Sequence, residues 1–264
     1  MLRVSVVDFL NARPLTWGLL HEPPAGVSVS RDLPSACAEK LASGEADVGL
    51  IPSIEYQRIP RLKAVPGLGI AAASEVRSVL LVSDVSRERI HSVSLDPASR
   101  TSAALTRILL RRRYGLSPSY GLTGSSSSSS GNILVKPDAR LIIGDPALKT
   151  RQNGRVVLDL AAEWRAFSGH PFVFAFWAVR PEAASPETAA LLRGSYESGL
   201  AHFAELVSGE ASATGLSGAV VEDYLRHALH YELERSDVEG LELFYRMAFE
   251  DGLIARERPI EWLA

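Results

Sequence analysis

Polar side chains suited to holding an anion stand just after the first predicted strand. Arg3–Val7 predicts a strand, and Asn11 and Arg13 follow it within a short loop. A carboxamide and a guanidinium two residues apart present several hydrogen-bond donors to a carboxylate. We expect Asn11 to lie at a reacting centre, the alternative being a turn that ends the strand. We expect Arg13 to bind substrate from a partly enclosed position, the alternative being a surface residue.

A second group of donors opens a predicted helix. Ser99, Arg100, Thr101 and Ser102 precede an apolar stripe at helical spacing. Hydroxyl groups and unpaired backbone N–H groups at a helix start form a ready anion site. Plain capping of the helix, which needs only one hydroxyl, is the alternative.

Three further polar residues lie at strand ends. The predicted buried strand Asp47–Ile51 stops at Pro52 and Ser53, and open α/β sheets form ligand crevices at such carboxyl ends. Ser78 starts another predicted strand, where its hydroxyl either points into a cleft or is an ordinary strand serine. Asp145 follows a buried strand and either lines the cleft or caps the helix that starts next to it.

The usual catalytic signatures are missing from the sequence. It contains no HExxH metal motif, no phosphate-binding P-loop and no GxSxG nucleophile turn. His227 and His230 share a helical face with Tyr224, but a third metal ligand is not evident. Cys37, the single cysteine, lies on the apolar face of a predicted helix and is expected to pack there. We therefore expect no metal and no cofactor.

Composition narrows the class of protein. The chain has 264 residues, 46% of them hydrophobic and 22% charged, as in globular proteins that bury a large core. The net charge of −3 gives no reason to expect a nucleic-acid partner. No segment approaches the roughly 20 apolar residues of a membrane helix. A single cysteine and a strand beginning almost at Met1 predict a cytoplasmic protein without an export signal.

The predicted elements form two α/β lobes around a cleft. The first, larger lobe is expected to hold residues 1–83 and 181–264, and the second holds residues 84–180. Three amphipathic helices end the chain, the last beginning with a capping box of Ser236 and Glu239. A serine tract at 125–130 predicts a flexible loop. Small ligands commonly bind in such inter-lobe clefts, whereas the oligomeric state is not readable from the pattern.

The ordered set of segments resembles the chorismate dehydratases of the futalosine route to menaquinone. The segments that carry the resemblance are 9–15, 32–56, 99–102, 141–146, 159–177 and 241–245. The resemblance implies a two-lobed fold of the type II periplasmic-binding-protein class. It also implies a lyase that needs no cofactor and converts chorismate to 3-[(1-carboxyvinyl)oxy]benzoate.

The resemblance also assigns roles to the candidate residues. Asn11 and Ser78 become catalytic candidates that hold reacting groups in place. The remaining candidates bind substrate, with the two lobes facing each other across it; they are Arg13, Ser53, Ile54, Ser99, Thr101, Ser102 and Asp145. One hypothesis is that the enolpyruvyl carboxylate of chorismate itself takes the proton.

Two alternatives remain at this stage. A solute-binding protein that clamps a small carboxylate without chemistry would share the fold. The related enzyme that cleaves cyclic dehypoxanthinylfutalosine carries a Ser-Pro-Cys-Pro type start and a catalytic histidine. This sequence has Asp8 to Arg13 at that start and no histidine near Asp145.

Overall fold

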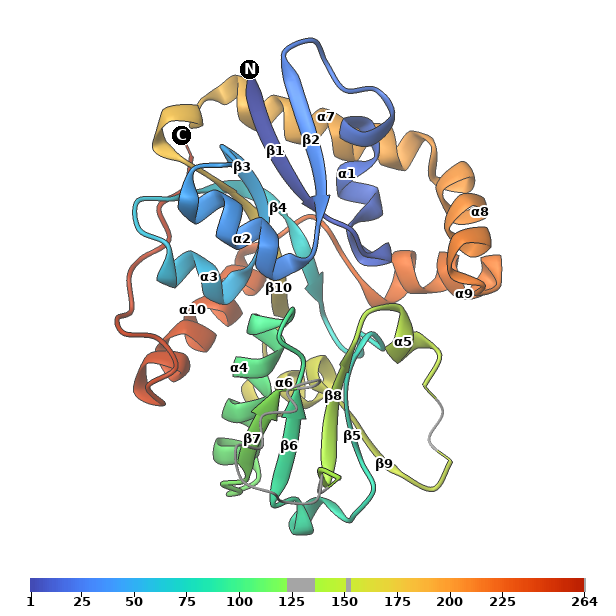
Figure 1. The fold of residues 1–264 in the computed structure, drawn as a ribbon, viewed down its shortest axis with the longest axis vertical. Coiled ribbons are helices and arrows are strands. Elements are labelled where there is room, and N and C mark those ends of the chain that lie inside the picture. Colours follow the sequence, from blue (N-terminus) through green and yellow to red (C-terminus); the bar gives the residue numbers. More distant parts are fainter. Residues whose placement is uncertain (123–135, 151–152, 264) are drawn as a thin grey trace, which may run out of the picture.

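Two five-stranded sheets form the centres of two lobes (Figure 1). The computed structural model describes residues 1–122, 136–150 and 153–263. The first sheet has the order β2-β1-β3-β10-β4. Its strands are β1 (Leu2–Val7), β2 (Val27–Asp32), β3 (Val48–Pro52), β4 (Lys63–Ala72) and β10 (Phe172–Val179). β1 runs parallel to β2 and β3, whereas β10 runs antiparallel to both of its neighbours.

The second sheet has the order β7-β6-β8-β5-β9. Its strands are β5 (Val79–Ser83), β6 (Ser92–Leu95), β7 (Ser119–Leu122), β8 (Ala139–Ile143) and β9 (Val156–Asp159). β6 is parallel to β7 and β8, and β5 is antiparallel to β8 and β9. The two-lobed α/β architecture expected from the sequence is confirmed. The serine tract at 125–130 lies outside the described residues.

The sheets also indicate where the chain passes between lobes. The boundaries drawn from the sequence, at 83/84 and 180/181, assign β5 to the first lobe and β10 to the second. Among the described strands, β5 pairs only within the second sheet and β10 only within the first. Both strands are entirely buried, so their hydrophobicity carries no information about which sheet they join. We therefore propose crossings at 73–78 and 169–171.

Helices cover both sheets. In the first lobe they are α1 (Arg13–His21), α2 (Pro34–Ser43), α3 (Ser53–Arg58), α7 (Pro186–Ala201), α8 (Phe203–Thr214), α9 (Gly218–Asp223) and α10 (Arg235–Glu250). The second lobe carries α4 (Arg100–Ile108), α5 (Asp145–Leu148) and α6 (Leu160–Ser168). α4 and α9 continue into the π-helical turns η3 (Leu109–Arg113) and η5 (Tyr224–Ala228). Short 3-10 turns occupy Leu10–Ala12 (η1), Arg87–Arg89 (η2) and Pro181–Ala183 (η4).

α1 and α7 pack unusually closely, and small residues make this possible. A Cβ atom added at Gly199 of α7 would lie 2.2 Å from the carbonyl oxygen of Pro14 in α1. Beside it, the Ser195 hydroxyl accepts from the N–H of Leu19 and donates to the carbonyl of Leu15. This contact fixes α1, and with it the loop before α1 that carries Asn11.

α10 begins differently from the expectation. The capping box is formed by Glu234 and Asp237 rather than by Ser236 and Glu239. The Asp237 carboxylate accepts from the backbone N–H of Glu234 at 2.8 Å. An acidic pair three residues apart makes the same reciprocal bonds as the serine–glutamate pattern, so the helix starts two residues earlier.

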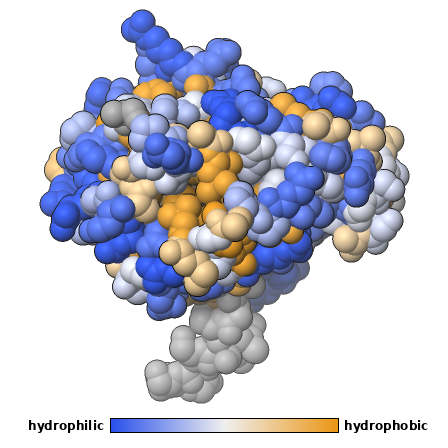
Figure 2. Space-filling model, turned by 90° about the horizontal axis from the view of Figure 1, so that it is seen from above, coloured by the Kyte–Doolittle hydropathy of each residue, from blue (hydrophilic) through white to orange (hydrophobic). Residues whose placement is uncertain are grey.

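One face of the molecule is mainly hydrophilic. Figure 2 shows hydrophilic side chains over most of the face seen from above, with an apolar area near its middle. None of the helices in the described part of the chain combines the length and the apolarity that crossing a bilayer requires. Cys37 is fully buried, as expected from its apolar helix face.

Candidate functional site

A cavity lies between the lobes, at the ends of strands from both sheets. It is lined by Val7, Phe9, Asn11, Pro34, Pro52, Ile70, Val76, Ser78, Val79, Ser99, Thr101, Ser102, Ile143, Gly144, Phe174 and Ala175. The space amounts to about 550 Å³ when its open mouth is included, but the room for the centres of water molecules is about 50 Å³. A water needs about 10–15 Å³ by this measure. The cavity is therefore tight, with room for only a few waters.

Five of the nine predicted site residues line this cavity: Asn11, Ser78, Ser99, Thr101 and Ser102. Asn11 sits in the 3-10 turn that links β1 to α1. Its side-chain oxygen is buried and has no hydrogen-bond partner among the residues that the structure describes. A buried amide oxygen without a partner is costly, so this acceptor is suited to a donor on a bound molecule.

The start of α4 contributes the donors. Ser99 stands at the N-cap, yet its hydroxyl does not cap the helix and instead donates to the Ser102 hydroxyl at 2.7 Å. The N–H groups in the first turn of a helix lack intrahelical acceptors, and they carry the positive end of the helix dipole. Because Thr101 and Ser102 line the cavity, this helix start can hold a carboxylate there.

Ser78 is the last residue of the segment 73–78, which we propose crosses between the lobes. Its side chain is 1% exposed, and its hydroxyl accepts a hydrogen bond from the Tyr224 hydroxyl at 2.7 Å. Sequence reasoning considered Tyr224 only as a neighbour of two histidines. Those histidines are engaged elsewhere, His227 with Asp223 and His230 with Asp237. Among the described residues, no three His, Cys, Asp or Glu side chains gather closely enough to hold a metal ion.

Ser53 and Ile54 lie behind the cavity wall and contact Thr101. The backbone N–H of Ile54 donates to the Thr101 hydroxyl at 3.2 Å, and the Ser53 hydroxyl is 3.4 Å from it. Ser53 itself is fully buried, donating to the carbonyl of Val173 and accepting through its own carbonyl from Tyr245. These two residues thus fix Thr101 from the opposite lobe, although neither is among the lining residues.

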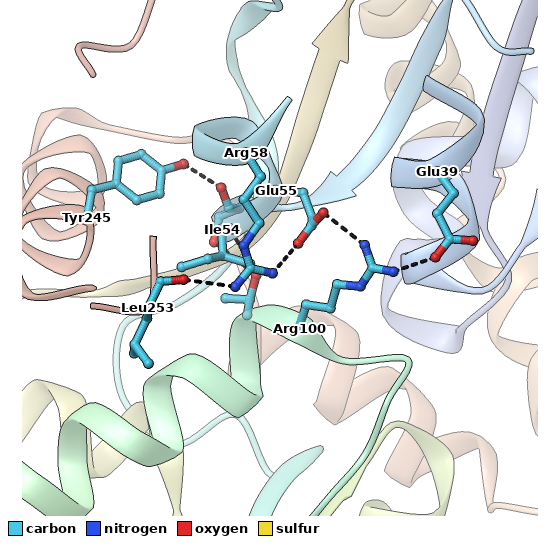
Figure 3. A network of polar contacts seen from close by, with 9 residues as sticks. Glu39, Ile54, Glu55, Arg58, Arg100, Tyr245 and Leu253 are labelled. Carbon is cyan, nitrogen blue, oxygen red and sulfur yellow. Dashed lines mark hydrogen bonds and ion pairs between the residues drawn. The ribbon is translucent and has the colours of Figure 1, made fainter. Parts of the chain in front are cut away.

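A charged network joins the lobes beside this contact (Figure 3). Glu55 of α3, whose side chain is 4% exposed, accepts from Arg58 at 2.6 Å and from Arg100 of α4 at 3.0 Å. Arg100 also pairs with Glu39 of α2, and Arg58 donates to the carbonyl of Leu253 at 3.1 Å. Sequence reasoning noted Arg100 only as part of the helix start. Its partners are 45 and 61 residues away in the chain, so no local pattern signals the pairing.

Arg13 and Asp145 are placed outside the lining. The Arg13 guanidinium lies 2.8 Å from Asp8 and 2.8 Å from Glu210 of α8. Burial opposes its charge, but these two carboxylates outweigh burial and raise the pKa of Arg13. Asp145 follows Gly144, which does line the cavity; burial raises the pKa of Asp145 against the attraction of Lys149 and Arg13.

The lining holds no ordinary acid or base. None of the described residues that line the cavity is His, Asp, Glu, Lys, Arg, Cys or Tyr. What the cavity offers instead is hydroxyl groups, one carboxamide and backbone N–H groups between apolar walls. Such a site can orient an anionic molecule and stabilise developing charge, but it cannot itself accept a proton readily.

Comparison with known proteins identifies the family to which this chain belongs. Residues 2–250 match the family described as "Menaquinone biosynthesis". The chain belongs to this family. Its relatives include the chorismate dehydratase of Thermus thermophilus, which is 29% identical in an alignment that covers 89% of this chain and 91% of the relative. A second is the chorismate dehydratase of Campylobacter jejuni, 30% identical over 64% of this chain and 63% of the relative.

Solved structures with low sequence identity to this chain show a similar fold. A structural-genomics protein of Archaeoglobus fulgidus matches with a TM-score of 0.75 and 16% identity, over 96% of this chain and 98% of that one. The periplasmic aliphatic sulphonate binding protein of Escherichia coli matches with a TM-score of 0.64 and 18% identity, over 98% and 90%. The periplasmic-binding-protein type of fold expected from the sequence is thereby confirmed for this family member.

Proposed function

We propose that this protein is a chorismate dehydratase of menaquinone biosynthesis, which converts chorismate to 3-[(1-carboxyvinyl)oxy]benzoate and water. Family membership and two chorismate dehydratase relatives support the activity. The observation that carries the mechanism is the lining itself, because its described residues combine anion-binding groups with the absence of a protein base.

The elimination needs orientation more than acid–base power. Chorismate is a cyclohexadiene with a ring carboxylate, an enolpyruvyl ether and an adjacent hydroxyl. When the proton on the ether-bearing ring carbon leaves, the electron pair of that C–H bond is delocalised towards the ring carboxylate. The neighbouring C–O bond then breaks, the hydroxyl group departs with its electron pair, and the ring becomes aromatic. The proton and the departing hydroxide together make the water released.

The substrate supplies the base in this proposal. The enolpyruvyl carboxylate is held beside the ring and takes the proton, since none of the described lining side chains is suited to that task. The α4 helix start, with Ser99, Thr101 and Ser102, binds a carboxylate of chorismate. Asn11 and Ser78 hold the reacting groups, so that the two parts of one molecule meet in a favourable geometry.

Arg13, Ser53, Ile54 and Asp145 support the site from outside its lining in this proposal. Ser53 and Ile54 fix the Thr101 hydroxyl from the other lobe. Arg13 acts through Asp8 and Glu210, which hold the start of α1 and the loop before it. Asp145 lies next to the lining residue Gly144, and its carboxylate is near the backbone N–H of Leu10.

A cytoplasmic location and independence of metals and cofactors complete the proposal. The single cysteine is buried and unpaired, which suits a reducing compartment. Cell fractionation with an antibody against the protein tests the location, and a signal confined to the periplasmic fraction would refute it.

The decisive experiment is incubation of the purified protein with chorismate. We expect the ultraviolet band of the cyclohexadiene to disappear and mass spectrometry to detect the aromatic product. If calorimetry instead shows tight binding while chorismate persists, the protein is a solute-binding protein and the catalytic proposal is wrong. If the protein neither binds nor consumes chorismate, chorismate is not its ligand.

A further inference from the structure

Tyr224 is a buried phenol that points at a site residue. It is the first residue of the π-helical turn η5, directly after α9. Its side chain is 1% exposed, and its hydroxyl donates to the Ser78 hydroxyl at 2.7 Å. Single π-helical turns often occur at functional sites. Tyr224 does not line the cavity, so any effect it has must pass through Ser78.

Beyond its bond with Tyr224, the Ser78 hydroxyl keeps its hydrogen and one lone pair. A serine hydroxyl has one hydrogen to donate and two lone pairs. Tyr224 occupies one lone pair, and the structure records no acceptor for the hydrogen among the described residues. Because Ser78 lines the cavity, its O–H is available to a molecule bound there.

The backbone of Ser78 is also fixed. Its N–H donates to the carbonyl of Val76 at 2.7 Å, and its carbonyl accepts from the N–H of Gly144 at 2.8 Å. The preceding residue, Arg77, has a φ of +61°, a conformation that costs a non-glycine residue energy. Two backbone bonds from Val76 and Arg77 to the Asp159 carboxylate hold this strained segment in place.

The pairing of Ser78 with Tyr224 is repeated one residue earlier in both segments of the chain. Arg77 donates through its guanidinium to the carboxylate of Asp223 and, at 3.2 Å, to its carbonyl oxygen. Residues 77–78 thus pair with residues 223–224 in register, which fixes the direction of the Tyr224 hydroxyl. Burial raises the pKa of Tyr224, so the phenol keeps its proton and stays a donor.

We infer that Tyr224 is a positioning residue for the elimination: its hydroxyl holds the Ser78 oxygen so that the Ser78 hydrogen points at the substrate oxygen that gains negative charge. Donation from tyrosine also polarises the serine hydroxyl and strengthens its own donation. The inference rests on the proposed function, because it assigns Tyr224 a part in that reaction. The interaction belongs to the transition state, so it acts on kcat more than on KM.

The test compares Tyr224→Phe, Ser78→Ala and the double variant in steady-state turnover of chorismate. We expect kcat to fall about 10-fold in Tyr224→Phe, with KM changed less than about twofold. In the Ser78→Ala background, Tyr224→Phe should have no further effect on kcat, because the group it positions is gone. Multiplying effects in the double variant, or wild-type kcat in a folded Tyr224→Phe protein, would overturn the inference.

A matched control tests whether the effect is specific to Tyr224, and a second pair of variants is available if Tyr224→Phe does not fold. Tyr231 is also buried, but its hydroxyl has no partner in the described part of the chain, so Tyr231→Phe should leave kcat unchanged. If Tyr224→Phe fails to fold, 4-aminophenylalanine and 4-fluorophenylalanine at position 224 replace it, since both fill the space of the hydroxyl. The amino variant, which still donates, should turn over faster than the fluoro variant; equal kcat values would refute the inference. Wild-type kcat in Ser78→Ala would instead refute the role proposed for Ser78.

Discussion

The charged network between the lobes allows a quantitative prediction of how strongly the closed arrangement of the two lobes is favoured. Arg100 of α4 binds Glu55 of α3 at 3.0 Å and also pairs with Glu39 of α2. It does not line the cavity. Substituting Arg100→Gln therefore removes a cation that joins the lobes without removing a group that lines the site.

The size of the effect follows from burial. Breaking a fully buried ion pair typically costs about 3–5 kcal/mol. Here the Glu55 side chain is 4% exposed but the Arg100 side chain is 32% exposed, and Glu55 keeps Arg58 at 2.6 Å. We therefore expect closure to weaken by about 1–2 kcal/mol, since partly exposed pairs contribute less. That is a shift of about 5- to 30-fold in the equilibrium between closed and open forms.

Two measurements check this prediction. KM for chorismate should rise several-fold, with a smaller change in kcat, because binding must now supply the energy of closure. Small-angle X-ray scattering of the free protein should give a larger radius of gyration for Arg100→Gln than for wild type. The matched control is Arg3→Gln, which breaks a bidentate pair with Asp47 inside the first lobe. Unchanged KM together with unchanged scattering would refute the closure role of Arg100.

Four shorter predictions accompany this one. Asn11→Ala should lower kcat by about 10²–10³-fold with little change in KM, and Asn11→Asp should weaken binding as well because it adds a negative charge; near-wild-type turnover in folded Asn11→Ala would contradict the role. Burial raises the pKa of the Cys37 thiol to about 12, so a maleimide should label it only on unfolding, and rapid labelling of the native protein would disprove its burial. Gly199→Ala should lower the free energy of unfolding by about 1–3 kcal/mol in denaturant titrations, and an unchanged value would mean that α1 and α7 separate freely. Turnover should survive exhaustive chelation, and loss restored by one added metal would refute the metal-free mechanism.

Much of the fold could be predicted from local pattern. Apolar runs such as Phe172–Val179 predict buried strands, and positions just after strands or at helix starts predict where polar groups gather. Asn11 and Ser78 line the cavity because both lie at strand ends that face the other lobe. The pattern could not assign β5 and β10 to their sheets, because pairing depends on residues far away in the chain.

The directions of individual side chains could not be predicted from the sequence either. Ser53 and Arg13 both follow strands, yet Ser53 turns inward to the carbonyl of Val173 and Arg13 turns to Glu210. Both partners are more than a hundred residues away, so spacing near either residue carries no signal of them. The same holds for Tyr224, whose bond to Ser78 spans 146 residues.

The bond between Thr101 and Ile54 has a kinetic consequence. It joins a residue that lines the cavity to the opposite lobe, so the complete site exists only while the lobes touch. The cavity of this structure has room for only a few waters, so we expect chorismate to enter and the aromatic product to leave through a more open form. We therefore expect each catalytic cycle to include an opening and a closing of the lobes. Where lobe opening limits the cycle, turnover depends on the viscosity of the medium even though no bond is made or broken in that step.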